Sequence, residues 1–456
     1  MRSCDILYIH STKNPNDDGN NKYATIPMGI IGILNRIISN GYSVIGINLA
    51  LEKRINYQYD IQKTLSTYNY KILMTDLHWY EHSYGAIEIA KKSKKVKPDI
   101  PVIIGGYTST IFSKEIMENF NCIDYIITGD SDDPACMLVD CIINKSHNIY
   151  DVPNLLFRKD GMIIESTKTW VATDLDQINF TDIGFFEHCD QIPIMSIDGK
   201  FKSFSSFWLC IARGCKFNCS YCCGANENMF ALFRRCNILT RSAEKVADDF
   251  MKIYNSGIER VSPSHDLQMF GKKYYKDVFS KIRNNSIRKG LYLECFQLPT
   301  KDYIDEIAKT FDPSMVNIVI SPISGNELLR KENGKLFSND ELYDTIEYIK
   351  SKQMIITLYY TVNIVGESKE QFFDTYFQMK YLNTVLGIEK KSILYQRVVL
   401  DPLAGMRKNS NINAQYNSFM DYYKYCQSNN SKYELTGFSD NAALSTDTKL
   451  DYYASI

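Results

Sequence analysis

Five of the thirteen cysteines in this chain of 456 residues fall in one stretch, Cys210-Ile-Ala-Arg-Gly-Cys215-Lys-Phe-Asn-Cys219-Ser-Tyr-Cys222-Cys223. Zinc sites usually pair two close cysteines with a second close pair of cysteines or histidines, because tetrahedral zinc takes four ligands. Cys215, Cys219 and Cys222 have no such fourth partner nearby. Three thiolates on one short loop suit a cubic iron-sulfur cluster in which the fourth iron stays open. The stretch therefore predicts a cluster whose open iron binds a ligand that comes and goes.

The composition excludes several classes of partner. Lysine and arginine number 52 and aspartate and glutamate 53, so the net charge is -1 and the chain lacks the positive charge of a nucleic-acid binder. No apolar run reaches the roughly 18 residues of a membrane span, and Met1-Arg2-Ser3-Cys4-Asp5 lacks the layout of a signal peptide. We therefore expect a cytoplasmic protein with no nucleic-acid or membrane partner. Structural disulfides are rare in that compartment, so the ten other cysteines, Cys210 and Cys223 included, are predicted to be packing residues.

The cysteine loop resembles the signature of radical S-adenosylmethionine (radical SAM) enzymes. The resemblance rests on Cys215-x-x-x-Cys219-x-x-Cys222, on the aromatic Tyr221 before the last thiol, and on Arg213-Gly214 ahead of the loop. It implies that the three thiols hold a 4Fe-4S cluster, that the open iron binds SAM, and that Tyr221 lies near the adenine. It further implies that one electron from the cluster splits SAM into methionine and a 5'-deoxyadenosyl radical. The alternative is a chance match in a cysteine-rich chain.

Downstream of the loop, strand and helix patterns alternate. Candidate strands occupy residues 207–212, 260–264, 292–297, 316–321, 355–365 and 392–400. Thr240 or Ser242 can cap one intervening helix, and the capping boxes Ser338-x-x-Glu341 and Ser368-x-x-Gln371 begin two others. Six alternations predict a partial (β/α)6 barrel of the TIM type, whose functional groups gather at the carboxyl ends of the strands.

The ends of the barrel strands offer candidate contacts to SAM. Where many radical SAM relatives carry Gly-Gly-Glu, this chain has Ser262-Pro263-Ser264-His265-Asp266, so Ser264 and Asp266 are the substitutes that we expect to hold the amino group. By resemblance, the ribose and adenine contacts come from later strand ends, at Ser321, Ser324, Asn363 and Val365. Taken singly, each of these residues could equally make an ordinary strand-to-helix turn.

The first third of the chain shows a separate alternation of strands and helices. Candidate strands occupy residues 5–10, 42–49, 71–75, 101–104 and 125–128, which predicts an open, doubly wound α/β sheet of the Rossmann type. Ligands of such sheets bind at the carboxyl ends of the strands, where glycine lets a large group approach the backbone. Neither a Gly-x-Gly-x-x-Gly nor a Gly-x-x-x-x-Gly-Lys nucleotide motif is present.

A Rossmann-like domain ahead of a radical SAM barrel resembles the cobalamin-binding domain of cobalamin-dependent radical SAM enzymes. The contacts implied by the resemblance are Met28, Gly29, Leu77, His78, Trp79, Gly105, Gly106, Tyr107, Thr108, Ser109, Thr110, Gly129 and Asp130.

Asp76-x-His78 is similar to the Asp-x-His-x-x-Gly loop that supplies a cobalt ligand in classical cobalamin proteins. However, it follows the third strand instead of the first, and position 81 is Glu. We therefore expect base-off cobalamin with no ligand from His78. His82 is predicted to be a structural histidine, and the sequence favours no role for His10.

The expected organisation has four parts. A cobalamin-binding domain spans 1–145, a bridging segment with a hairpin at Asp160-Gly161 spans 146–205, the barrel spans 206–400, and a tail that closes the active site spans 401–456.

The function implied by these resemblances is that of a cobalamin-dependent radical SAM enzyme, most simply a methyltransferase. It would place a methyl group from methylcobalamin on a carbon of a small-molecule or peptide natural product, with flavodoxin or ferredoxin as electron donor. Alternatives are polar methylation, a rearrangement without methyl transfer, a radical SAM enzyme whose first domain has lost its cofactor, and a non-enzymatic iron-sulfur or metal-binding protein. A methylthiotransferase is disfavoured, because Cys4, Cys122, Cys136 and Cys141 lack cluster spacing.

Overall fold

The computed structural model describes two compact units. The described residues are 2–16, 25–194, 204–362, 364, 366–397, 401–408, 413–414, 416–428, 438–439, 444 and 446–456. The N-terminal unit comprises Met1–Ser205, Phe230–Arg235 and Tyr416–Tyr433, and the barrel unit comprises Ser206–Met229, Cys236–Gln415 and Glu434–Ile456. No described helix is both long and apolar enough to cross a membrane.

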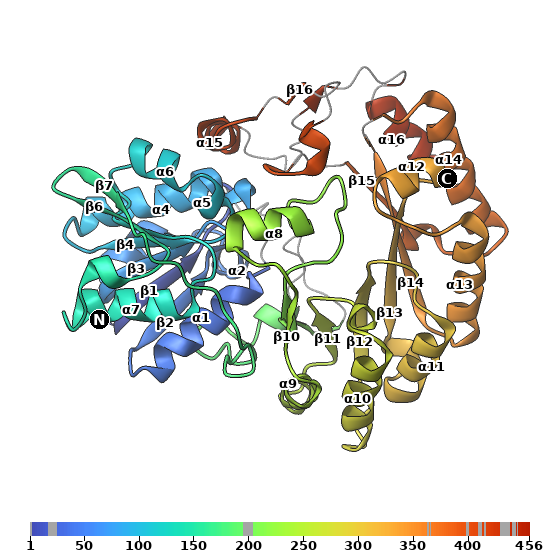
Figure 1. Cartoon of the computed structure of the whole chain (residues 1–456), viewed down its shortest axis with the longest axis horizontal. Helices are drawn as coiled ribbons and strands as arrows, with labels where there is room; N and C mark the ends of the chain where they lie inside the picture. The colour runs from blue at the N-terminus through green and yellow to red at the C-terminus, as the bar shows by residue number, and fades with distance from the viewer. Residues whose placement is uncertain are drawn as a thin grey trace. The chain divides into compact units, whose positions relative to one another are not determined.

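The N-terminal unit is built on a seven-stranded sheet of order β2-β1-β3-β4-β5-β6-β7 (Figure 1). Its first five strands are parallel, which confirms the doubly wound sheet. They are β1 (Ser3–His10), β2 (Val44–Asn48), β3 (Asn69–Asp76), β4 (Val102–Gly105) and β5 (Tyr125–Ile127).

The hairpin at Asp160-Gly161 extends this sheet, whereas the sequence predicted a bridge between domains. Strands β6 (Leu155–Lys159) and β7 (Met162–Glu165) pair antiparallel, and β6 also pairs antiparallel with β5. Asp160 and Gly161 have φ of 49° and 77°, the left-handed conformation of a tight hairpin turn. Leu155, Leu156 and Phe157 are buried successively, so β6 contributes to the core of the unit.

Helices cover both faces of this sheet. Helix α1 (Met28–Ser39) packs beside α7 (Asp132–Ile143), and α3 (Ile61–Thr67) packs beside α4 (Ser83–Val96). The shorter elements are α2 (Leu49–Ile55), η1 (Tyr80–His82), α5 (Tyr107–Ile111) and α6 (Ser113–Asn119).

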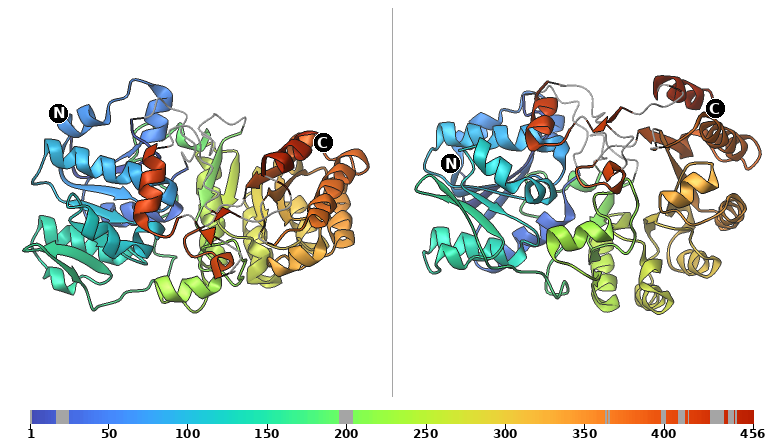
Figure 2. Two further views of the ribbon diagram at one scale, coloured as in Figure 1. Left: turned by 90° about the horizontal axis from the view of Figure 1, so that it is seen from above. Right: turned by 45° about the horizontal axis from the view of Figure 1, so that its top comes forward.

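One helix of the N-terminal unit comes from the tail that the sequence assigned to the barrel mouth. Helix α15 (Phe419–Ser428) packs against α4, and Figure 2 shows this red helix beside the blue elements of the unit. The rings of Phe419 and Tyr423 lie 5.9 and 5.1 Å from the ring of Phe120. The carboxylate of Glu115 accepts hydrogen bonds from the first backbone N–H groups of α15, at 2.8 and 3.1 Å.

The barrel unit contains six parallel strands in the order β15-β14-β13-β12-β11-β8, which confirms the partial barrel. They are β8 (Ser206–Leu209), β11 (Arg260–Pro263), β12 (Gly290–Cys295), β13 (Asn317–Ile323), β14 (Ile355–Val362) and β15 (Ile393–Arg397). The helices are α8 (Asn226–Phe233), α9 (Ala243–Asn255), α10 (Lys272–Arg283), α11 (Lys301–Thr310), α12 (Glu327–Glu332), α13 (Asn339–Ser351), α14 (Lys369–Thr384) and α16 (Thr446–Ala454). Both predicted capping boxes are present, and Ser242 caps α9.

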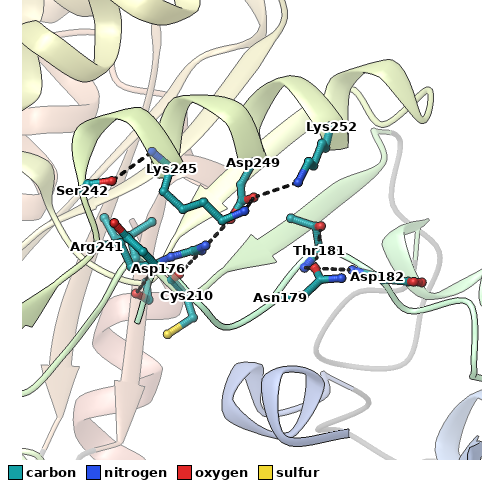
Figure 3. Close-up of polar contacts among 12 residues, drawn as sticks. Asp176, Asn179, Thr181, Asp182, Cys210, Arg241, Ser242, Lys245, Asp249 and Lys252 are labelled. Atoms are coloured by element: carbon teal, nitrogen blue, oxygen red, sulfur yellow. Dashed lines mark hydrogen bonds and ion pairs between the residues drawn. The ribbon is translucent and has the colours of Figure 1, made fainter. Parts of the chain in front are cut away.

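A buried ion pair fixes the entry to the cysteine loop (Figure 3). The Arg241 guanidinium lies 2.5 Å from the Asp249 carboxylate, and both side chains are almost completely buried. Arg241 also donates to the carbonyl of Cys210 at 3.2 Å, and its backbone N–H donates to Ile211 at 3.0 Å. The pair therefore ties helix α9 to the segment that leaves β8.

Replacing Asp249 with Ala should lower the free energy of unfolding of the barrel unit by about 3 kcal/mol, because it removes the carboxylate from a buried guanidinium. Chemical denaturation followed by circular dichroism measures the loss. Lys252→Ala is the matched control, since Lys252 is 58% exposed and 3.9 Å from the same carboxylate. It should change stability by less than about 0.5 kcal/mol. Equal effects of the two substitutions would contradict a stabilising role for the buried ion pair of Arg241 and Asp249.

Candidate functional site

The cysteine loop follows β9 (Ala212–Arg213), beyond the end of β8. Cys215, Cys219 and Cys222 are half-buried free thiols. The N–H of Cys222 donates to the carbonyl of Cys219 at 3.1 Å, and the N–H of Phe217 donates to the sulfur of Cys215 at 3.4 Å. Gly334 approaches so closely that an added Cβ would lie 3.3 Å from the Cys219 sulfur. The loop thus keeps three thiols on a tight turn with glycine against one of them.

Burial opposes ionisation of two of these thiols, Cys215 and Cys222. It raises the pKa of Cys222 to about 12, helped by the nearby carboxylate of Asp401, and it raises the pKa of Cys215. Burial also lowers the pKa of Lys335, whose ammonium donates to the carbonyl of Phe296 at 2.8 Å. Thiolates at these positions require added positive charge, and bound metal supplies it. The donor set therefore fits an iron-sulfur cluster.

Two residues beyond the motif hold the loop, and neither was predicted from the sequence. Asp401 accepts a hydrogen bond from the N–H of Cys223 at 3.1 Å, and burial raises its pKa to about 6. Asn333 pairs with the hydroxyl of Ser220. The Asp401-Pro402 step is visible in the sequence, but nothing in it signals a contact with Cys223, 178 residues away.

Tyr221 packs among apolar side chains at the strand ends. Its neighbours are Ile323, Leu329, Ile364, Ala404 and Met406. The N–H of Met406 donates to the carbonyl of Ser220 at 2.7 Å, so residues beyond the last strand contribute to the loop's surroundings. The adenine contact of Tyr221 stays a prediction.

Ser264 and Asp266 at the end of β11 are engaged in the structure of the unit. The Ser264 hydroxyl accepts from the N–H of Ile211 at 3.0 Å and contacts His265 at 2.8 Å. His265 in turn lies 2.9 Å from the carbonyl of Gly214. Asp266 is 2% exposed and accepts from the N–H of Gln268 at 3.0 Å. These residues connect β11 to the cysteine loop, a role that the sequence did not indicate for His265.

The candidate contacts at the later strands are placed unequally. Ser321 lies within β13. Ser324 is completely buried, contacts the Thr375 hydroxyl at 3.1 Å, and accepts from the N–H of Asn326 at 3.1 Å. Asn363 and Val365 lie outside the described residues. The contacts of all four with SAM stay predictions.

In the N-terminal unit, hydrogen bonds join the loop after β3 to the loop after β4, and the loop after β4 to the loop after β5. The N–H groups of Ser109 and Thr108 donate to the carbonyls of Leu77 (3.2 Å) and His78 (3.3 Å). The hydroxyl of Thr110 accepts from the N–H of Gly129 at 3.0 Å. Six of the candidate contacts, Leu77, His78, Thr108, Ser109, Thr110 and Gly129, are therefore joined directly by hydrogen bonds.

Gly106 permits this convergence. Its φ is 121°, and an added Cβ would lie 2.7 Å from the carbonyl carbon of Leu77. The ring of His78 packs 5.1 Å from Trp79 and 6.0 Å from Tyr107, and burial lowers its pKa. The aromatic side chains form one wall, and the neighbouring backbone at Gly106 has a conformation that favours glycine. Together they suit a large, flat cofactor.

The remaining N-terminal candidates differ in their accessibility. Met28 and Gly29 begin α1, and an added Cβ at Gly29 would meet no atom within 4 Å. The Asp130 carboxylate is buried, pairs with Arg235, and accepts from the N–H of Ala172 at 2.9 Å. The side chain of Asp130 thus holds the unit together, and Arg235 is a partner that no local pattern revealed.

The burial of Asp266 can be tested through the pH dependence of the free energy of unfolding. Burial raises the pKa of Asp266 to about 6 in the folded protein. The folded state then binds more protons than the unfolded state between about pH 4 and pH 6, so stability is lost as pH rises through this range. Asp266→Asn should therefore raise the unfolding free energy by about 2 kcal/mol at neutral pH, and by less near pH 5. Urea denaturation at both pH values measures this difference, and an equal gain at both would contradict it.

The comparisons with known proteins find a partial sequence relative and solved structures of similar fold. No model of a known protein family matches the sequence. An uncharacterized methyltransferase of Pyrococcus horikoshii is 23% identical over 211 residues, which are 45% of this chain and 41% of that protein. The radical SAM methyltransferase TsrM of Kitasatospora setae, solved with cobalamin and a 4Fe-4S cluster, matches with a TM-score of 0.67 at 12% identity, over 100% of this chain and 89% of TsrM.

Two further structures match over most of this chain. TsrM with tryptophan and a SAM analogue gives a TM-score of 0.62 at 13% identity, over 89% of this chain and 75% of that one. The cobalamin-dependent SAM radical enzyme OxsB gives 0.55 at 12% identity, over 97% of this chain and 65% of OxsB. The chain therefore has the two-part fold of the cobalamin-dependent radical SAM enzymes.

Proposed function

We propose that this protein is a cobalamin-dependent radical SAM methyltransferase. The observation that carries the proposal is the three-thiol loop that follows the first strand of a six-stranded parallel barrel. A second sheet in the same chain brings glycine-containing loops together at its carboxyl edge. The matched fold adds support, since TsrM was solved with cobalamin and a 4Fe-4S cluster.

In the barrel unit, Cys215, Cys219 and Cys222 would hold the cluster, which supplies the electron for reductive cleavage of SAM. The chain's own residues keep the loop in position. Asp401 fixes the backbone at Cys223, and Asn333 holds Ser220. Gly334 leaves room beside Cys219. Ser264, Asp266, Ser321, Ser324, Asn363 and Val365 remain the proposed SAM contacts.

In the N-terminal unit, the convergent loops would hold cobalamin, which supplies a methyl carrier. We propose that it binds base-off, with the segment from Leu77 to Trp79 against its lower face and without coordination by His78. The packing of His78 between Trp79 and Tyr107 supports a role as part of the wall. The substrate would be a small molecule or a peptide, and the electron donor a flavodoxin or ferredoxin in the cytoplasm.

Alanine at Cys215, Cys219 or Cys222 should abolish the cluster, because each substitution removes one of only three protein ligands. After anaerobic reconstitution with iron and sulfide, absorbance near about 400 nm and reductive formation of 5'-deoxyadenosine from SAM should both fall to background. Cys223→Ala is the matched control and should retain both. Loss in the control together with retention in the triad variants would overturn the ligand assignment.

Gly106→Ala should weaken retention of hydroxocobalamin at least about tenfold, because the added Cβ forces the loops after β3 and β4 apart. Gel filtration followed by cobalamin absorbance measures retention, and the cluster should be unaffected. Gly271→Ala is the control, since Gly271 also has a positive φ (98°) but lies in the barrel unit, with nothing within 4 Å of an added Cβ. Equal retention by the two variants would refute the proposed cobalamin site.

A further inference from the structure

A buried polar cluster lies in the N-terminal unit, apart from the cysteine loop. His10 ends β1, Asp76 ends the adjacent strand β3, and His82 ends η1. His10 and His82 are completely buried and Asp76 is 4% exposed. One potential ligand atom from each residue lies within 4.8 Å of the others. The chain has six histidines, so the gathering of two of them around one carboxylate is a distinct feature of this unit.

Two buried polar atoms of this cluster have no hydrogen-bond partner among the described residues. Nδ1 of His10 lies 2.8 Å from one oxygen of Asp76, and the hydroxyl of Tyr8 donates to that same oxygen at 2.7 Å. The other oxygen of Asp76 and Nε2 of His10 are buried and have no hydrogen-bond partner among the described residues. Leaving a buried polar atom without a hydrogen-bond partner is unfavourable, so two such atoms in one cluster require an explanation.

The residue types of the cluster suit a cation. Aspartate binds metals as a carboxylate and histidine as a neutral imidazole. Here one carboxyl group and two imidazoles are buried and offer ligand atoms within 4.8 Å of one another.

We infer that His10, Asp76 and His82 form a second metal site, which takes a divalent transition metal of the zinc class. Two imidazoles and one carboxylate are a ligand set that zinc accepts, with water available as a fourth ligand. Bonds of about 2.0–2.2 Å place tetrahedral ligands roughly 3.4 Å apart, so ligand atoms that now lie within 4.8 Å of one another must draw closer around the ion.

The position of the site indicates a structural role. The metal would join the ends of β1 and β3 to the end of η1. Leu77, His78 and Trp79 lie between the last two of these ligands in the chain, and the carbonyls of Leu77 and His78 accept hydrogen bonds from Ser109 and Thr108 of the loop after β4. A bound metal would therefore hold this segment in place.

The test is the zinc content of the full-length protein. Zinc can also occupy empty cysteine sites, so the protein carries the combined substitutions Cys215→Ala, Cys219→Ala and Cys222→Ala. The protein is incubated with zinc chloride and passed over a chelating resin. Inductively coupled plasma mass spectrometry should then find about one zinc per chain. His82→Gln in this background should reduce the zinc content at least about tenfold.

His188→Gln is the matched control. His188 also pairs with a carboxylate, that of Glu52 at 2.8 Å, but its side chain is 46% exposed. Its substitution should leave the zinc content unchanged. Absence of zinc from the protein with the three cysteine substitutions, or equal zinc content in the His82→Gln and His188→Gln proteins, would overturn the proposal.

X-ray absorption at the zinc edge keeps the test decisive if His82→Gln does not fold. In the protein with the three cysteine substitutions, the first shell of zinc should contain nitrogen and oxygen only, with the outer-shell scattering of imidazole. A sulfur shell, or a shell without imidazole, would overturn the proposal. The zinc content does not depend on methyl transfer. A negative zinc result would therefore leave the proposed function standing, and absence of methyl transfer would leave the proposed zinc site standing.

Discussion

Burial works against charge at the cysteine loop, and the surrounding barrel unit is organised around that conflict. The carboxylate of Asp401 helps burial to raise the pKa of the Cys222 thiol, and burial raises the pKa of Asp401 itself. The ammonium of Lys335 is buried and has a lowered pKa. The protein environment therefore disfavours a thiolate at Cys222, and hydrogen bonds to the backbone hold the loop in place. Asp401, Ser264 and Arg241 all act in this way, through Cys223, Ile211 and Cys210.

The N-terminal unit differs from the cysteine loop, because a large cofactor needs an accessible sheet edge and not three thiols on one short loop. The order β2-β1-β3-β4-β5 places the topological switch point of the sheet between β1 and β3. His10 and Asp76 end these two strands, whereas the glycine-containing loops follow β4 and β5. The carboxyl edge of the sheet thus has two parts. Buried polar side chains lie at the ends of β1 and β3, and glycine-containing loops follow β4 and β5.

Local patterns in the sequence predicted much of this architecture. The spacing of Cys215, Cys219 and Cys222, the capping boxes at Ser338 and Ser368, and the alternation of strands each depend on residues close in the chain. The hairpin at Asp160-Gly161 was predicted as a turn, but its pairing with β5 was missed, because antiparallel and parallel partners have the same local pattern. Contacts such as Asp130 with Arg235, separated by 105 residues, leave no local signal at all. For the same reason Ser264 and Asp266 were identified as ligand contacts without any sign of their structural bonds.

The place of helix α15 has a consequence for how the chain is made. Phe419, Tyr423 and Cys426 belong to the same apolar core as Met117 and Phe120, and Glu115 caps the first turn of the helix. On the ribosome, the N-terminal residues emerge long before Phe419 is synthesised, so the sheet must wait with this face of α4 and α6 uncovered until the barrel has been translated. During that interval Phe120 and its neighbours are an exposed apolar surface and a natural binding site for a chaperone. Folding of the first unit is thereby completed by a helix that is translated after all six strands of the barrel.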